Sequence, residues 1–338
     1  MKRFFNKYAL SGVLVFAIAY SLGPRIDLDE TIQPIVLPAD LATYISNSES
    51  QIPDIKPNTE KTIVWADPKQ RQTTPFSIIY LHGFSASRQE IAPVCDTVAE
   101  SLGANLFYTR LTGHGRGSNA MAKISVNALV NDALEALEIG KQLGHEVIVI
   151  GTSTGATLAT WLASHDKSQR IAALVLISPN YGPKRIESEL LLLPWGETLL
   201  QLVEGPTYQF EPYNALQEQY WTTKYPSEAL LPMMGIVKLT RDKDLNSIQA
   251  PVLTMYSPDD RIVDSNAIRE TFARFTSEQK KLVSVADADD PQQHVIAGNI
   301  MSPKTTEKVT NNILEFIRQL PSTPKSEPNT PATSYKSP

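Results

Sequence analysis

A serine between two glycines stands at the junction of an apolar run and a helix-forming stretch. The segment Gly151-Thr152-Ser153-Thr154-Gly155 follows Val147 to Ile150 and precedes Ala156 to Ala163. In the pattern G-x-S-x-G, a serine leaves a buried strand on a turn so tight that side chains at the glycine positions would collide. The next helix brings backbone N–H groups and the positive end of its dipole beside the hydroxyl. This order of elements predicts that Ser153 is a nucleophile.

A serine hydroxyl is a weak nucleophile at neutral pH, so Ser153 needs a base within hydrogen-bond reach. The chain has five histidines, and we favour His294, which follows the last predicted strand and completes the chain order serine, acid, histidine. The other four have different expected roles: His82 shapes the oxyanion-hole loop, His114 is structural or lines the pocket, and His145 and His165 are solvated or capping residues.

The acid that orients the histidine is expected just beyond the predicted strand Val252 to Tyr256. Three aspartates follow that strand, and we favour Asp260. Asp259 is interpreted as a turn residue and Asp264 as the cap of the next helix, because aspartate is common in both places. An aspartate against the imidazole N–H fixes its tautomer and stabilises the imidazolium that forms when the serine loses its proton.

Short apolar runs alternate with longer stretches of helical period from Lys61 onward, which predicts an α/β fold with a mostly parallel central sheet and helices on both faces. The predicted strands are Thr62 to Trp65, Phe76 to Leu81, Asn105 to Arg110, Glu146 to Ile150, Ala172 to Ile177, Val252 to Tyr256 and Lys281 to Val285. The predicted helices are Arg88 to Leu102, Ser125 to Leu143, Ala156 to Ser164, Ser265 to Phe275 and Pro303 to Gln319. In the second helix, Asn131, Asp132, Glu135 and Lys141 can face water.

The interval between Ser178 and Pro251 is too long for an ordinary connection. We expect a mostly helical cap over about residues 181–247, inserted after strand 6 of the fold. The interval is rich in leucine and aromatic residues, including Tyr208, Trp221 and Tyr225. Most of them should pack the cap on the body, and as a group they are expected to wall an apolar acyl or alcohol pocket.

Three further segments, together with the serine turn, resemble the α/β-hydrolases, specifically the carboxylesterase and monoacylglycerol lipase-like (serine aminopeptidase-type) branch. They are Leu81-His82-Gly83-Phe84, Leu111-Thr112-Gly113-His114-Gly115 and Pro251 to Val263. The resemblance spans about residues 61–320, cap excepted. It implies an α/β-hydrolase fold in which Phe84 and Thr154 supply the oxyanion-hole N–H groups. Ser257 departs from the glycine frequent in the family's acid turn, without touching a proton-transfer group.

Composition excludes several classes of partner and site. The 338 residues carry a formal charge of -5 and the body has no strongly basic stretch, so a nucleic-acid partner has no electrostatic support. The single cysteine, Cys95, rules out an intramolecular disulfide and a multi-cysteine metal site. Its helical surroundings predict a buried small hydrophobe.

The two ends of the chain differ from the body. Lys2, Arg3 and Lys7 precede the uncharged run from Tyr8 to Pro24, which predicts a signal anchor or a cleaved signal peptide over residues 1–24. The protein is therefore expected to be membrane-anchored or exported, with membrane association through its N-terminus. Residues 25–60 suggest a linker or an irregular wrap, and residues 321–338, rich in Pro, Ser, Thr and Lys, predict a disordered tail.

The function favoured by these residues is a serine hydrolase that cleaves carboxylic esters of an apolar acyl chain or a small alcohol through an acyl-enzyme, without metal or cofactor. Monoacylglycerol and lysophospholipid esters are candidate substrates. An aminopeptidase, amidase or thioesterase would use the same triad, and four glutamates of the cap leave a site for an α-amine open: Glu187, Glu189, Glu197 and Glu204. A non-catalytic membrane-tethered scaffold would be marked by a missing triad residue, and none is missing.

Overall fold

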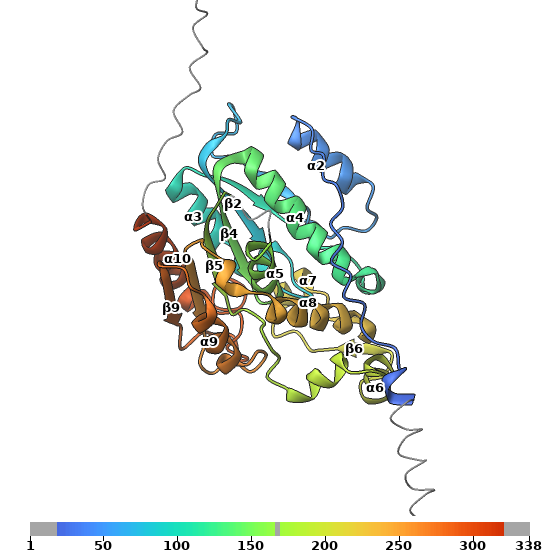
Figure 1. Ribbon diagram of the computed structural model, residues 1–338. Helices are drawn as coiled ribbons and strands as arrows, with labels where there is room; N and C mark the ends of the chain where they lie inside the picture. Colours follow the sequence, from blue (N-terminus) through green and yellow to red (C-terminus); the bar gives the residue numbers. More distant parts are fainter. Residues whose placement is uncertain (1–18, 166–169, 321–338) are drawn as a thin grey trace, which may run out of the picture.

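A seven-stranded sheet forms the centre of the protein in the computed structural model, which describes residues 19–165 and 170–320 (Figure 1). Its strands are β1 (Thr62–Val64), β2 (Thr74–Leu81), β3 (Asn105–Tyr108), β4 (Gly144–Thr152), β5 (Ile171–Ile177), β8 (Val252–Tyr256) and β9 (Lys280–Ser284). Their order across the sheet is β1-β3-β2-β4-β5-β8-β9, and every neighbouring pair except β1 and β3 is parallel. The predicted mostly parallel sheet is confirmed.

Side chains of the strands alternate between two apolar cores on opposite faces of the sheet. In β4, Val147 and Val149 belong to one core and Ile148 and Ile150 to the other, as a strand buried on both sides requires. The first core is shared with α4 (Val126–Leu143) and α5 (Thr154–Ala163), the second with α3 (Val94–Leu102) and α10 (Pro303–Arg318) (Figure 1). Two further elements complete the body, η2 (Ser118–Lys123) before α4 and α9 (Ser265–Arg274) after β8. Cys95 is buried in the second core, as expected.

The helix predicted from Arg88 to Leu102 is two separate pieces. A 3-10 turn, η1 (Arg88–Ile91), comes first, and α3 begins only at Val94. Pro93 lies between them, and a proline has no N–H to donate and disfavours helical backbone at the residue before it. Ala92 accordingly has an extended ψ of 135°.

The chain between β5 and β8, residues 178–251, is here called the insertion, and it lies at one end of the body (Figure 1). It is mostly helical, as predicted, and also contains a short antiparallel ladder of β6 and β7 that the sequence did not suggest, because three-residue strands are too short to show a period. Its elements are η3 (Ile186–Leu192), α6 (Gly196–Val203), β6 (Thr207–Gln209), α7 (Ala215–Tyr220), β7 (Lys224–Pro226), η4 (Ser227–Ala229), α8 (Leu230–Asp242) and η5 (Leu245–Ser247).

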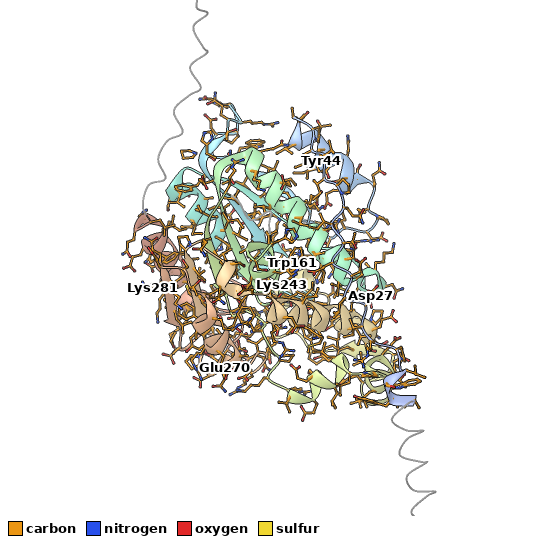
Figure 2. The ribbon with its side chains drawn as sticks, in the orientation of Figure 1. Asp27, Tyr44, Trp161, Lys243, Glu270 and Lys281 are labelled. Carbon is orange, nitrogen blue, oxygen red and sulfur yellow. The ribbon has the colours of Figure 1, made fainter. Side chains whose placement is uncertain are left out.

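Residues 25–60, predicted to be a linker or an irregular wrap, pack against the body and contain a helix, α2 (Leu41–Ser50). We call residues 25–40 the strap. Thr31 of the strap accepts a hydrogen bond from Asn131 Nδ2, and Tyr44 of α2 donates one to Glu135. Tyr44 is labelled in Figure 2. The polar face of α4 that was expected to face water is therefore partly covered by the N-terminal chain.

Glu30 fastens the strap to two other parts of the molecule. Trp161 Nε1 of α5 donates a hydrogen bond of 2.9 Å to Glu30 Oε2, and Lys243 Nζ, at the end of α8, lies 2.7 Å from the same oxygen. Trp161 and Lys243 are labelled in Figure 2. Apolar side chains of the strap, among them Leu28 and Ile32, pack on the first core. One carboxylate thus joins the strap, the body and the insertion.

The expectations of a signal anchor and of a membrane-anchored or exported protein are corrected. Within residues 19–165 and 170–320, no helix has the length and apolar character needed to cross a membrane. The anchor was inferred from composition, whereas the described end of the apolar run leaves helical structure after Ser21 and continues into Gly23 and Pro24. Residues 1–18, most of the predicted signal, and the predicted tail 321–338 lie outside the described residues.

Candidate active site

The turn that carries Ser153 joins β4 to α5 and is strained. Ser153 has a φ of 52°, in the region that residues other than glycine rarely adopt. A Cβ on Gly151 would lie 2.5 Å from Gly155 O, and a Cβ on Gly155 would lie 1.9 Å from Leu81 O. The backbone is therefore packed too closely for a side chain at either glycine, as expected of a turn that exposes a nucleophile.

His294 lies between Ser153 and Asp260. Its Nε2 is 2.9 Å from Ser153 Oγ, and its Nδ1 is 2.8 Å from Asp260 Oδ2. Ser153 follows β4, Asp260 follows β8 and His294 lies in the loop after β9. The carboxyl ends of parallel strands meet at one edge of a sheet, so residues far apart in the sequence converge there. The structure thus brings together the three residues that the sequence singled out.

Asp260 is fixed by the loop that carries it. Its Oδ1 accepts the backbone N–H groups of Ile262 at 2.8 Å and Val263 at 2.9 Å, which leaves Oδ2 for the imidazole. The side chain of Asp260 has no exposed surface. Of the other two candidate acids, Asp259 is exposed and Asp264 caps α9, the roles expected for them.

The loop of His294 is held by two side chains that the sequence analysis did not single out. Asp290 Oδ2 accepts the backbone N–H groups of His294 at 3.0 Å and Val295 at 2.8 Å, and the Ser178 hydroxyl donates to His294 O at 2.7 Å. Asp290 precedes a proline, and aspartates in such turns commonly accept nearby backbone N–H groups, so a signal for it was present. Ser178 offered none, because its partner is 116 residues away.

Nearby carboxylates favour the protonated form of His294. Burial alone would lower its pKa, but Asp260, and then Asp290 and Glu90, more than offset this effect and raise the pKa above its usual value. The Nδ1 atom faces a carboxylate, so it carries the proton, and Nε2 is free to accept one from the serine hydroxyl. The geometry suits a general base.

The expected oxyanion donors flank Ser153. Thr154 begins α5, and Phe84 lies in the loop after β2. A Cβ built on Gly83 would lie 3.4 Å from Ser153 Cβ, so this loop runs against the serine turn. The backbone N–H groups of Phe84 and Thr154 have no acceptor among the described residues. Both N–H groups are therefore free of a protein acceptor in the described part of the chain, as an oxyanion donor must be.

His82 and His114 brace the loop that carries Phe84. His82 Nε2 accepts the Leu111 N–H, and His114 Nε2 accepts the Ser85 N–H, each at 3.0 Å. Both imidazoles are fully buried, and their rings lie 5.0 Å apart. Burial, their largest influence, lowers the pKa of His82 well below its usual value and that of His114 to about 4. Both are neutral, which matches the structural roles expected for them.

The insertion places aromatic side chains against the oxyanion loop. The Phe84 ring lies 5.5 Å from that of Tyr225, which stacks on Tyr208 at 5.4 Å. The Thr222 N–H donates to Ser85 O at 2.7 Å and joins the two segments. Apolar and aromatic surfaces of this kind line ligand sites. These contacts pack the insertion on the body, as expected for most of its aromatic residues, and a wall of an apolar pocket stays a prediction.

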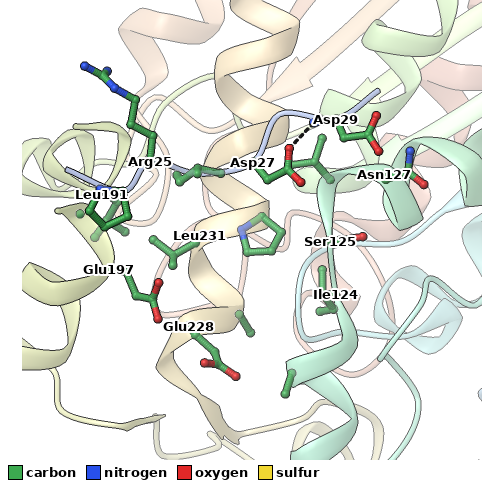
Figure 3. A pocket seen from close by; sticks show the side chains of 17 residues that line it. Arg25, Asp27, Asp29, Ile124, Ser125, Asn127, Leu191, Glu197, Glu228 and Leu231 are labelled. Carbon is green, nitrogen blue, oxygen red and sulfur yellow. Dashed lines mark hydrogen bonds between the residues drawn. The ribbon is translucent and has the colours of Figure 1, made fainter. Parts of the chain in front are cut away.

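A cavity of about 570 Å³ lies elsewhere, between the strap, the insertion and the start of α4 (Figure 3). Its carboxylates come from Asp27 and Asp29 of the strap and from Glu197 and Glu228 of the insertion. None of Ser153, Asp260 and His294 lines it. The candidate site is therefore defined by the three converging side chains and not by this cavity.

Comparison with known proteins identifies the family. The family model described as serine aminopeptidase, S33, matches residues 74–288, which is more than half of the chain. The chain belongs to this family. The matched range begins at β2 and includes the Ser153 turn and Asp260, and it ends before His294. The predicted resemblance to this branch of the α/β-hydrolases is confirmed, and the protein is an enzyme of that class.

Individual relatives of this family member agree in fold. The chain is 23% identical over 223 residues to the thermostable monoacylglycerol lipase of Bacillus sp. (strain H-257), covering 66% of this chain and 86% of the relative. The structure of the present chain is similar to a solved structure from work on LipS and LipT, two metagenome-derived lipolytic enzymes. The TM-score is 0.63 at 18% identity, with coverage of 78% of this chain and 99% of the other. A soluble variant of the monoglyceride lipase of Saccharomyces cerevisiae gives a TM-score of 0.59 at 15% identity, covering 76% and 90%. These likenesses confirm the α/β-hydrolase fold.

Proposed function

We propose that the protein is a serine esterase that hydrolyses carboxylic esters of an apolar acyl chain or a small alcohol. The observation that carries this proposal is the continuous set of contacts from Ser153 through His294 to Asp260. Kinship with a monoacylglycerol lipase supports ester hydrolysis as the class of reaction. The aromatic side chains of the insertion beside Phe84 support an apolar substrate.

In the first half of the reaction, Ser153 Oγ attacks the carbonyl carbon of the ester while its proton passes to His294 Nε2. The negative oxygen that forms accepts the N–H groups of Phe84 and Thr154. The imidazolium, stabilised by Asp260, then gives its proton to the alkoxide of the leaving group as the carbon–oxygen bond breaks. The alcohol departs and the acyl group stays on Ser153.

In the second half, a water molecule attacks the acyl carbon while His294 takes one of its protons. The same two N–H groups hold the negative oxygen again. His294 returns the proton to Ser153 Oγ as the bond between the acyl carbon and the serine oxygen breaks. The carboxylic acid leaves and the enzyme regains its starting state, so the cycle consumes one water molecule per ester.

Ser153→Ala removes the nucleophile and should lower kcat on p-nitrophenyl butyrate by roughly 10⁴-fold or more. Ser164→Ala, at the other end of α5, is the matched control and should keep wild-type activity. A fluorophosphonate should form an adduct on Ser153 that mass spectrometry locates. Full activity of Ser153→Ala would disprove the proposal, and an unlabelled, inactive wild-type protein would favour a non-catalytic binding protein.

An aminopeptidase is the second candidate, because the family description names that activity. Two of the four glutamates considered for binding an α-amine do not favour it. Glu189 is paired with Arg241 at 2.9 Å, and Glu197 lines the separate cavity. Assays on p-nitrophenyl esters of increasing chain length, on monoacylglycerols, on lysophospholipids and on aminoacyl p-nitroanilides separate the two activities. We expect turnover of the esters only.

A further inference from the structure

One buried acid next to Ser153 has no part in the reaction steps above. Glu90 lies in η1, where it is 2% exposed. Its Oε1 accepts the Gly83 N–H at 2.5 Å and the Tyr80 hydroxyl at 2.6 Å. Gly83 immediately precedes Phe84. The Glu90 carboxyl group therefore holds Gly83, whose carbonyl carbon is bonded to the Phe84 nitrogen, one of the proposed oxyanion donors.

Glu90 is also connected to the serine turn. The Tyr80 hydroxyl lies 3.0 Å from the Oγ1 of Thr152, the residue before Ser153. A Cβ built on Gly83 would lie 2.9 Å from Glu90 Oε2 and 3.4 Å from Ser153 Cβ, so one small residue separates the carboxyl group from the nucleophile. Glu90 thus contacts the loop that carries Phe84 directly and the serine turn through Tyr80.

We propose that Glu90 is a positioning residue for ester hydrolysis: its carboxylate fixes the Gly83–Phe84 backbone against the Ser153 turn. A hydrogen bond from a backbone N–H to a carboxylate is about twice as strong as one to a neutral acceptor, so the charge of Glu90 stiffens the loop. The inference rests on the proposed esterase function, because its effect is exerted on the steps proposed for Ser153 and His294.

The ionisable groups around Glu90 agree with this role. They are Tyr80 of β2, Cys95 of α3 and His294 of the loop after β9. Burial raises the pKa of Glu90 to about 7, against the opposing influence of Tyr80, Gly83 and His294. Burial also raises the pKa of the Cys95 thiol well above its usual value, which leaves it uncharged. Glu90 therefore gains its charge near neutral pH, and its charge and that of the His294 imidazolium favour each other.

Glu90→Gln tests the proposal, because it keeps the size and the acceptor oxygen but removes the charge. On p-nitrophenyl butyrate we expect kcat at pH 8 to fall about 10-fold or more, with KM changed by less than about twofold. The acid limb of kcat/KM should move to lower pH, because the imidazolium loses a favourable neighbour. Asp96→Asn is the matched control: Asp96 also accepts a tyrosine hydroxyl, that of Tyr108 at 2.7 Å, and should leave all three quantities unchanged.

Tyr80→Phe is the second variant, since it removes only the hydroxyl that joins Glu90 to Thr152, and we expect a fall in kcat of about threefold to tenfold. It decides the question if Glu90→Gln does not fold. Unchanged kcat in a folded variant overturns the proposal, and so does a lower melting temperature with an unmoved acid limb. If Ser153→Ala retains wild-type activity, the esterase assignment itself fails, which the Glu90 variants alone would not reveal.

Discussion

At the scale of single residues, one carboxylate oxygen of Asp260 accepts backbone N–H groups and the other faces His294 Nδ1. Asp260→Asn is therefore a sharp test of what this residue does. The amide oxygen would keep the bonds to the Ile262 and Val263 N–H groups, so an amide NH₂ would face His294 Nδ1. The imidazole proton would then move to Nε2, which could no longer accept the serine proton. We expect kcat to fall roughly 10³- to 10⁴-fold with little change in KM.

Steady-state kinetics of purified Asp260→Asn measures this loss. Asp259→Asn is the control, because Asp259 is adjacent in sequence but exposed, and it should behave as the wild type. A loss of less than tenfold would mean that Asp260 does not set the tautomer of His294. It would then have to be assigned a structural role in its loop.

The residues that could be predicted are those whose signal is local. Ser153 is marked by its two glycines, and Asp260 by its place after a predicted strand. Glu90 and Asp290 act on the backbone N–H groups of folded loops, and a sequence does not state where those groups point. Glu90 was also concealed in a stretch predicted to be an ordinary amphipathic helix.

At the scale of elements, the two imidazoles that brace the oxyanion loop make that loop sensitive to acid. His82 and His114 each accept a backbone N–H through Nε2. Protonation of Nε2 would place an imidazole N–H against that backbone N–H, and two donors cannot bond to each other. Their folded pKa values lie below the unfolded value of about 6.5, so the stability they contribute is fully present above pH 6.5 and is lost as pH falls toward 4.

We therefore expect His114→Asn to flatten the loss of stability on acidification, by at most about 1.4 kcal/mol per pH unit between pH 6.5 and 4. Urea unfolding at several pH values measures the slope. His145→Asn replaces an exposed histidine at the start of β4 and should retain the wild-type slope. Equal slopes for His114→Asn and the wild type would show that the brace is not the acid-sensitive element.

The elements themselves were largely predictable, and the failures have local causes. The inner strands of the sheet are buried on both faces and appear in the sequence as apolar runs. The prediction of one helix over 88–102 is wrong because Pro93 interrupts the helical backbone, although the apolar period continues across it. The small ladder of β6 and β7 has too few residues to show alternation.

At the scale of the whole molecule, the strap joins parts of the chain that the sequence keeps far apart. Glu30 contacts Trp161 of α5 and Lys243, which follows α8 in the insertion. Glu30→Ala would leave the Trp161 N–H without this acceptor and Lys243 without its partner. Since the Glu30–Lys243 ion pair is partly exposed, we expect a loss of roughly 1 kcal/mol in the free energy of unfolding.

The urea midpoint of Glu30→Ala measures this contribution. Asp29→Ala is the control, because the Asp29 carboxylate accepts its hydrogen bonds from Thr31 in its own turn. Equal midpoints for the two variants would show that the strap contributes nothing through Glu30. The packing of residues 25–60 could not have been predicted from composition, because Pro, Asp and Ser suit a linker and a strap equally well.

The insertion leaves the sheet after β5 and returns at β8, and these two strands are hydrogen-bonded neighbours, with Ile177 opposite Met255. Because the two strands are parallel, the insertion leaves at the carboxyl edge of the sheet and returns at the amino edge, while Ser153, Asp260, His294, Phe84 and Thr154 all lie outside it. The molecule is in this sense modular, apart from Ser178 at the start of the insertion, whose hydroxyl holds the loop of His294. The rest of the insertion can vary without removing Ser153, Asp260 or His294. Selection can then alter which molecules are admitted while the bond-breaking machinery is inherited intact.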